Sequence, residues 1–203
     1  MSWEFLVTSL IVIVSPGTGV LYTLATGLSR GSKASIVAAF GCTLGIVPHM
    51  AAAIMGLAAL LHTSALAFET LKYAGVAYLL YMAWMTLQES GALAVEKQPE
   101  RSSRQVIVHA ILINILNPKL TIFFFAFLPQ FVPAGTPDGW LQMTWLSLVF
   151  MAATFAVFVL YGIFAATMRR QVLARPRVVR WMRRTFAATY LLLAGRLAFT
   201  SST

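Results

Sequence analysis

The chain has 203 residues, of which 59% are hydrophobic and only 10% are charged, and its formal net charge is +9. Soluble domains carry about 25% charged residues, so this composition cannot coat a water-facing surface and lipid must be the solvent. The basic residues lie in short loops between apolar stretches, which excludes a nucleic-acid-binding surface, and the single cysteine, Cys42, excludes an internal disulfide and a thiolate metal cluster.

Six apolar stretches are long enough to cross a bilayer as helices, which takes roughly 20 residues each. In chain order they cover residues 5–28, 36–61, 66–87, 106–131, 143–168 and 181–199. The longest polar stretch, residues 88–104, divides them into two sets of three. We therefore predict an all-α membrane protein in which residues 1–90 form a first three-helix repeat, residues 91–105 a cytoplasmic linker and residues 106–203 a second three-helix repeat.

Lysine and arginine alternate between the predicted loops, and this alternation sets the orientation of the spans. The loops after the first, third and fifth stretches carry basic residues, whereas those after the second and fourth carry none. We expect the basic loops in the cytoplasm and both termini outside. Three spans per half then give the halves opposite orientations, as in an inverted repeat. The arginine-rich loop, residues 169–184, is expected to contact anionic lipids.

A proline interrupts the first apolar stretch of each half near its middle. The first break reads Ser15-Pro16-Gly17-Thr18 and the second Leu116-Asn117-Pro118-Lys119. Proline removes a backbone donor, and in lipid the freed groups need another partner. Interrupted segments at corresponding positions predict a transport site between inverted repeats. The alternative is a pair of kinked helices, because proline is common in membrane helices.

Each break offers groups that can bind a substrate at mid-membrane. The half-helix that resumes after each proline presents unpaired N–H groups and a positive dipole end, which suit a carboxylate. Gly17 lets a ligand approach the backbone, while Thr18 and Asn117 can add side-chain hydrogen bonds. The predicted substrate-binding residues are Ser15, Pro16, Gly17, Thr18, Asn114, Asn117, Pro118 and Lys119.

Lys119 is the most informative single residue, because an ionisable group at membrane depth is costly and indicates a function. In one role its ammonium pairs with an anionic group of the substrate. In the other it donates hydrogen bonds to carbonyls freed by Pro118. The sequence leaves both roles open.

Three further ionisable residues are candidates for coupling or gating. Glu69 and Lys72 are three residues apart and can pair on one helix face. They form either a gate or an interfacial pair with a snorkelling lysine. His49 lies inside the second stretch, and histidine is the residue type suited to proton transfer at physiological pH, so it either relays protons or is a core histidine bonded to a carbonyl.

Five short motifs, in order along nearly the whole chain, resemble one transporter family. They are Ser15-Pro16-Gly17, Leu28-Ser29-Arg30-Gly31, Leu71-Lys72-Tyr73-Ala74-Gly75 with Tyr78-Leu79, Leu116-Asn117-Pro118-Lys119 with Phe127-Leu128-Pro129-Gln130-Phe131, and Gly195-Arg196-Leu197. Together they resemble the LysE/RhtB amino-acid exporters. The resemblance implies a bacterial inner-membrane exporter of amino acids such as lysine, homoserine or threonine, coupled to the proton gradient. One departure is that Thr18 and Gly19 stand where the family often has a second proline followed by Asp or Asn.

Other classes of function fit the sequence less well. An intramembrane enzyme would need a catalytic set, but there is no His-Glu-x-x-His motif, no paired intramembrane carboxylate and no cysteine pair. We therefore expect no catalysis, no cofactor and no metal site. The open alternatives are an exporter of a cation or another small metabolite, and a membrane subunit without transport activity. A homodimer is compatible with so small a bundle.

The predicted topology can be tested by accessibility labelling of tags. Tags at either terminus should be reached from the periplasmic side, and a tag near Glu96 in the linker should not, because the basic loops are expected to stay in the cytoplasm. Spheroplasts labelled before and after permeabilisation provide the comparison. Cytoplasmic termini would contradict the inverted repeat, since the two halves would then need a different number of spans.

Overall fold

The computed structural model describes most of the first, second, fourth and fifth predicted spans. The described residues are 2–15, 17–60, 101–132 and 137–168, with scattered positions between 70 and 84 and between 184 and 198. In chain order the elements are α1 (Trp3–Val14), α2 (Thr18–Arg30), α3 (Ser32–Leu44), α4 (Val47–Leu60), α6 (Ser103–Ile115), α7 (Pro118–Ile122), the π-helix η1 (Phe123–Phe127), the 3-10 helix η2 (Leu128–Phe131) and α8 (Gly139–Thr167). Residues 91–100 of the linker and most of the third and sixth spans lie outside the described residues, as does the arginine-rich loop except Arg184.

Both proline breaks are present, and they bend the chain by the same amount. The pair α1 and α2 is bent by 53°, and so is the pair formed by α6 and the segment Pro118–Phe131. The residue before each proline has left helical geometry, with ψ of 141° at Ser15 and 102° at Asn117. Such a change is expected, because the proline ring disfavours a helical conformation in the preceding residue.

Two other helical segments have no such bend. The segment Ser32–Gly56, which joins α3 and α4, and α8 are each long and apolar enough to span a membrane. Counting each bent pair as one span gives up to four in the described part of the chain. A short turn at Gly45 separates α3 from α4, where Pro48 cannot donate a hydrogen bond to the preceding turn. The six-span inverted repeat as a whole remains a prediction.

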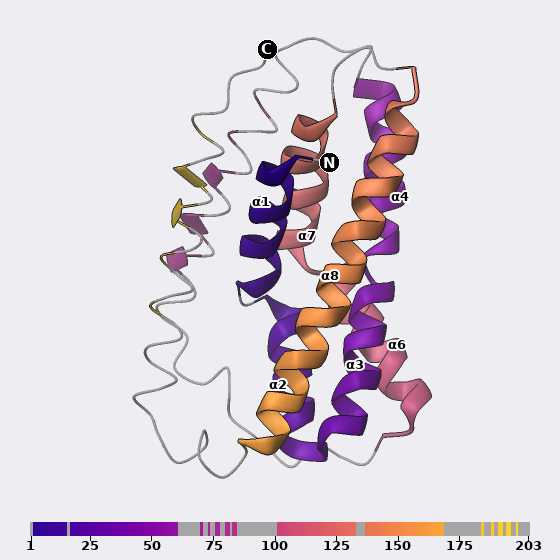
Figure 1. Ribbon diagram of the computed structural model, residues 1–203, viewed down its shortest axis with the longest axis vertical. Coiled ribbons are helices and arrows are strands. Elements are labelled where there is room, and N and C mark those ends of the chain that lie inside the picture. The colour runs from indigo at the N-terminus through magenta and orange to yellow at the C-terminus, as the bar shows by residue number, and fades with distance from the viewer. Residues whose placement is uncertain are drawn as a thin grey trace.

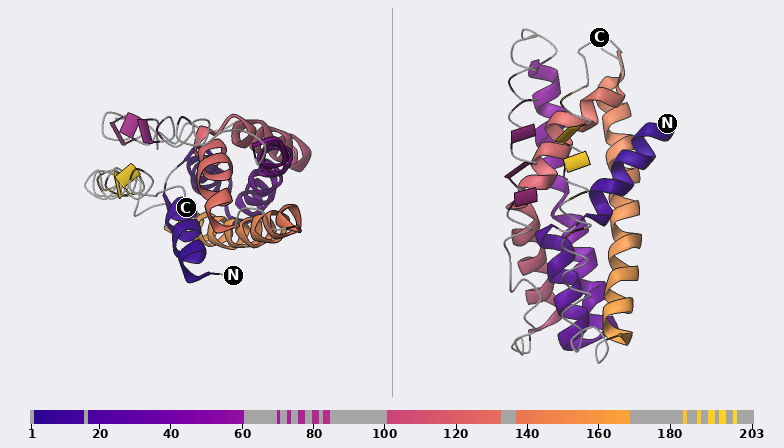
Figure 2. Two further views of the ribbon diagram at one scale, coloured as in Figure 1. Left: turned by 90° about the horizontal axis from the view of Figure 1, so that it is seen from above. Right: turned by 90° about the vertical axis from the view of Figure 1, so that its left-hand side faces the viewer.

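The helices form a bundle in which α8 runs the full length of the molecule (Figure 1). It packs against α2 and α3 over one half and against α4 over the other. Seen from above, α8 forms one side of the bundle and α1 lies at its edge (Figure 2). On another face α3 packs against α6. The two bent segments thus pack against the segment Ser32–Gly56 and α8, which lack such a bend.

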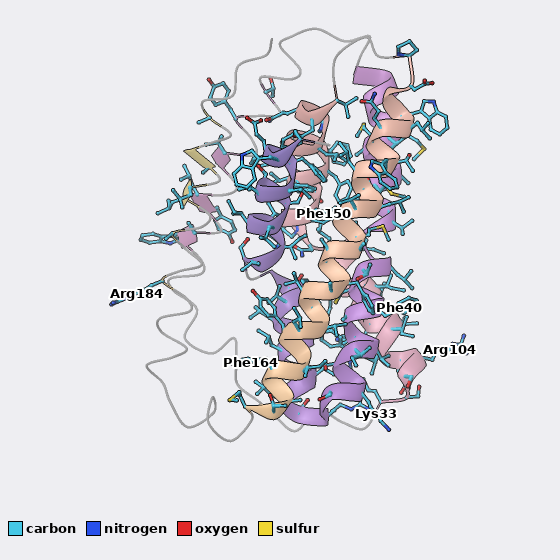
Figure 3. The ribbon with its side chains drawn as sticks, in the orientation of Figure 1. Lys33, Phe40, Arg104, Phe150, Phe164 and Arg184 are labelled. Carbon is cyan, nitrogen blue, oxygen red and sulfur yellow. The ribbon has the colours of Figure 1, made fainter. Side chains whose placement is uncertain are left out.

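One end of the molecule gathers basic residues of the first basic loop and of the end of the linker. Lys33 at the start of α3 and Arg104 at the start of α6 lie at the same end (Figure 3). The side chain of Arg30 donates a hydrogen bond to the carbonyl of Arg101, which ties the α2–α3 turn to the start of α6. At that turn Gly31 has φ of +85°, a conformation that favours glycine. The first basic loop and the end of the linker are therefore on the same side, as the alternation of charge predicts.

The interior combines an aromatic cluster with contacts between small residues. The rings of Phe123 and Phe150 stack with centroids 4.2 Å apart, so the π-helix packs directly on α8. At Gly41, by contrast, an added Cβ would lie 2.7 Å from Ala110 Cβ and 2.8 Å from the Ile107 carbonyl oxygen. The backbones of α3 and α6 therefore approach closely, as membrane helices do at small residues.

Replacing Gly41 by alanine should lower the thermal unfolding midpoint of the protein in detergent. The added methyl group forces α3 and α6 apart, and overpacking of this kind costs about 1–3 kcal/mol. The matched control is Gly56→Ala, where the added Cβ would first meet the Phe125 ring at 3.4 Å. Both variants gain helix propensity, so equal midpoints for the two would contradict the close contact at Gly41.

Candidate functional site

The two breaks lie against each other, which the sequence alone did not establish. The Thr18 hydroxyl, just after the first break, donates to the carbonyl of Ile113, just before the second, at 3.3 Å. In the same turn of α2, a Cβ added at Gly19 would lie 2.7 Å from Asn114 Oδ1. The start of α2 therefore fits closely against the end of α6, and the interruptions form one site rather than two.

Lys119 bridges the breaks from within. It is only 5% exposed, and its Nζ donates to the carbonyl oxygens of Val12 at 2.9 Å and of Ser15 at 2.8 Å. Within the part of the chain that the structure describes, these two carbonyls are its side-chain hydrogen-bond partners, and no carboxylate is among them. Lys119 thus carries out the carbonyl-binding role considered above, but on carbonyls of the first break rather than on those freed by Pro118.

The Lys119 ammonium lies where one helix ends and the next begins. Val12 and Ser15 end α1, whose carbonyl end is negative, and Gly17 is the N-cap of α2, whose N–H end is positive. A Cβ added at Gly17 would lie 3.1 Å from Lys119 Nζ. The ammonium is therefore held by the negative end of α1 and lies beside the positive end of α2, so an anion next to it would be stabilised by both positive neighbours.

Two buried asparagines, Asn114 and Asn117, stabilise the second break through their hydrogen bonds. Asn117 caps α7, since its Oδ1 accepts from the backbone N–H of Lys119 at 3.2 Å. Its Nδ2 donates to Asn114 Oδ1 at 3.1 Å, and Asn114 Nδ2 donates to the carbonyl of Cys42 at 2.6 Å. This chain of hydrogen bonds links α7 through α6 to α3, and it fixes the position from which Lys119 extends.

His49 connects α4 to the same break. Its Nε2 is 3.1 Å from the carbonyl oxygen of Asn114, and its Nδ1 is 3.3 Å from Thr121 Oγ1. A carbonyl oxygen only accepts, so Nε2 carries the proton in this contact. Thr121 donates to Nδ1 when the ring is neutral and accepts from it when the ring is charged. Both contacts can therefore persist in either protonation state.

One rule relates Lys119 to His49. In an α-helix the carbonyl of a residue accepts from the N–H four positions later, and proline has no N–H. Val12 precedes Pro16 by four positions, and Asn114 precedes Pro118 by four. The ammonium of Lys119 binds the first of these carbonyls and the imidazole of His49 the second. At both breaks, the carbonyl that the proline deprives of its regular helical partner is bound by an ionisable side chain.

The structure brings together every predicted substrate-binding residue that it describes. The exceptions are residues it does not describe, namely Pro16 in the first break and the coupling candidates Glu69 and Lys72. Sequence reasoning did not single out Tyr161, whose hydroxyl donates to the carbonyl of Val14 at 3.1 Å. Nor did it identify Val12 as a hydrogen-bond acceptor, although counting four residues back from Pro16 would have found it.

Comparisons with known proteins identify the family of the chain. The family model of LysE type translocators matches residues 10–201. An uncharacterized membrane protein of Vibrio cholerae is 30% identical over 188 residues, which cover 92% of this chain and 91% of that protein. The homoserine/homoserine lactone efflux protein of Salmonella typhimurium is 28% identical over 200 residues, covering 97% of this chain and 95% of its own. No solved structure gives a significant match.

The family match spans nearly the whole chain and includes both breaks with the residues that join them. It confirms the family expected from the five motifs, and it confirms that the function is transport and not catalysis. The chain belongs to the LysE type translocator family and is a membrane efflux transporter.

Proposed function

We propose that the chain exports amino acids or close derivatives across the bacterial inner membrane, driven by the proton gradient, and that the substrate binds where the two breaks meet. The observation that carries this proposal is the buried Lys119 ammonium, which is bound to Val12 and Ser15 and has no carboxylate partner among the described residues. A buried cation without a counter-ion is costly. A substrate carboxylate would provide that counter-ion.

The first break offers the better binding site for such a carboxylate. Gly17, the N-cap of α2, provides no side-chain hydrogen bond to the first turn, whereas Asn117 caps α7 with its own side chain. Helix N-termini attract anions through their N–H groups and dipole. In this proposal the substrate carboxylate approaches the start of α2 and pairs with Lys119, and Thr18 lies within the same turn.

His49 is the described residue best placed for proton coupling. Its imidazole keeps both hydrogen bonds in either protonation state, and one of them is to the Asn114 carbonyl, which Pro118 deprives of its regular helical donor and which also accepts from the N–H of Asn117. Taking up a proton reverses the hydrogen bond to Thr121, which lies one turn beyond the break. Proton uptake by His49 would thus add a positive charge at the second break, while both contacts of the ring persist.

The relatives support this class of substrate. Homoserine and its lactone, which appear in the name of the Salmonella typhimurium relative, are small polar compounds that share a primary amino group. They differ in that homoserine has a free carboxylate and the lactone has none. A site that binds the amino group and tolerates either form of the acid would suit both compounds.

Efflux from proteoliposomes tests the proposal and the role of Lys119 together. Vesicles preloaded with a panel of amino acids should export some of them faster under a proton gradient. Lys119→Met should reduce this efflux by about 10- to 100-fold, because a hydrogen bond to a charged group is worth about 1.5–3 kcal/mol. Methionine keeps the apolar stem and removes the charge.

The matched control is Lys33→Met at the exposed start of α3, which should export like the parent. Efflux is normalised to folded protein, because losing the ammonium leaves two carbonyls without this donor. Parental efflux by a folded Lys119→Met protein would remove Lys119 from the substrate site. No efflux of any amino acid by the parent would contradict the proposed function itself.

His49→Gln should separate coupling from substrate binding. Glutamine can still donate to the Asn114 carbonyl, but it cannot take up a proton. Gradient-driven efflux should fall close to the rate without a gradient, while exchange of labelled for unlabelled substrate continues at about half the parental rate or more. The control is His109→Gln, a histidine whose ring packs against Tyr22. Undiminished stimulation by the gradient in His49→Gln would exclude His49 as the coupling residue.

A further inference from the structure

The end of α1 forms a binding site for an ammonium group. Two carbonyl oxygens, those of Val12 and Ser15, converge on one nitrogen at 2.9 and 2.8 Å. Both residues are buried, and the carbonyl end of a helix favours a cation. In the structure this nitrogen is Lys119 Nζ, which reaches α1 from the other half of the chain. We call the carbonyls of Val12 and Ser15 the ammonium seat.

The seat and the start of α2 together match the two charged groups of an amino acid. Carbonyl acceptors end α1, and the start of α2 follows at Gly17, whose missing Cβ would be 3.1 Å from the nitrogen in the seat and 3.2 Å from Asn117 Nδ2. The absence of a side chain at position 17 lets the Lys119 ammonium and the Asn117 side chain approach the backbone at this junction. Acceptors for an ammonium and donors for a carboxylate therefore lie within one interrupted helix.

We propose that the Lys119 ammonium occupies the position that the primary ammonium of the substrate takes during transport. When the substrate binds, its ammonium enters the ammonium seat and Lys119 turns to its carboxylate. This inference rests on the proposed function and adds to it the group that decides specificity. A substrate with a primary ammonium can enter the seat, whereas a compound whose nitrogen is acylated cannot.

The exchange avoids leaving the Ser15 carbonyl without a donor, and it keeps an ammonium on the Val12 carbonyl, to which the Ser15 hydroxyl also donates at 2.9 Å. A buried carbonyl without a partner costs about 1–3 kcal/mol, and in lipid the cost is higher. In the structure the ammonium of Lys119 satisfies both carbonyls, and after the exchange the substrate ammonium does so. Both are primary ammonium groups with three N–H donors, of which two are used in the seat. Lys119, once released, pairs with the carboxylate.

Chemical rescue tests whether the seat exists independently of the lysine tether. Lys119→Ala removes the three methylene groups and the ammonium that together correspond to n-propylammonium. Adding n-propylammonium to this variant in detergent should raise its thermal midpoint saturably, by about 2–4 °C. The neutral isostere 1-propanol should not. Neither the parent nor Lys119→Met should respond, since the space is filled in both, and the exposed-site control Lys33→Ala should not respond either.

Absence of a specific response in Lys119→Ala would overturn the seat. If this variant does not accumulate, n-propylammonium is supplied during expression and purification, and recovery of monodisperse protein on size exclusion becomes the readout. Recovery with n-propylammonium but not with 1-propanol supports the seat. Equal recovery with both compounds, or with neither, overturns it.

Transport by the parent tests whether the substrate uses the seat. Homoserine, which has both the ammonium and the carboxylate, should be exported at least about tenfold faster than N-acetylhomoserine, which keeps only the carboxylate. Equal export of N-acetylhomoserine would overturn the exchange, even where rescue succeeds. If the parent exports no amino acid, the proposed function fails, and the rescue experiment still decides separately whether the ammonium seat exists.

Discussion

A carbonyl that loses its helical donor inside a membrane must find another, and the described structure is organised around this constraint. Pro16 and Pro118 each remove the N–H that a carbonyl four residues earlier would have used. The replacement donors are long or basic side chains from elsewhere in the fold, and the principal one is Lys119. Its two hydrogen bonds join the halves of the chain at the point where both helices are interrupted.

The rest of the bundle keeps this junction in place. The unbroken α8 packs along α2, α3 and α4, and the aromatic contact between Phe123 and Phe150 fixes the π-helix that follows the second break. Contacts between small residues hold α3 against α6, so that Cys42 and Asn114 meet. Rigid, closely packed helices thus surround a short stretch of irregular backbone, which is where membrane proteins tolerate such backbone.

The sequence was most informative where a single residue type imposes its own geometry. Proline predicted both breaks, and the run of apolar residues predicted α8. The sequence did not predict which residues of different helices contact each other. Lys119 was considered as a ligand of carbonyls near Pro118, but which carbonyls it reaches depends on how α1 packs beside α7, and no local pattern records that packing. A carbonyl-bound histidine was one of the two predicted roles of His49. That the carbonyl belongs to Asn114 depends on the register of α4 against α6, which the sequence does not specify.

Gly17 and Lys119 each follow their proline by one residue, so they hold equivalent places in the two breaks. The lysine side chain passes so close to Gly17 that a methyl group there would touch it at 3.0 Å. The junction therefore has room for one long side chain contributed by one half only. Any duplication that gave both halves the same residue at this place would either crowd two cations together or leave the carbonyls at the end of α1 without their ammonium donor. Asymmetry between the halves is thus a steric and electrostatic requirement, and substitutions at these two positions should occur as compensating pairs.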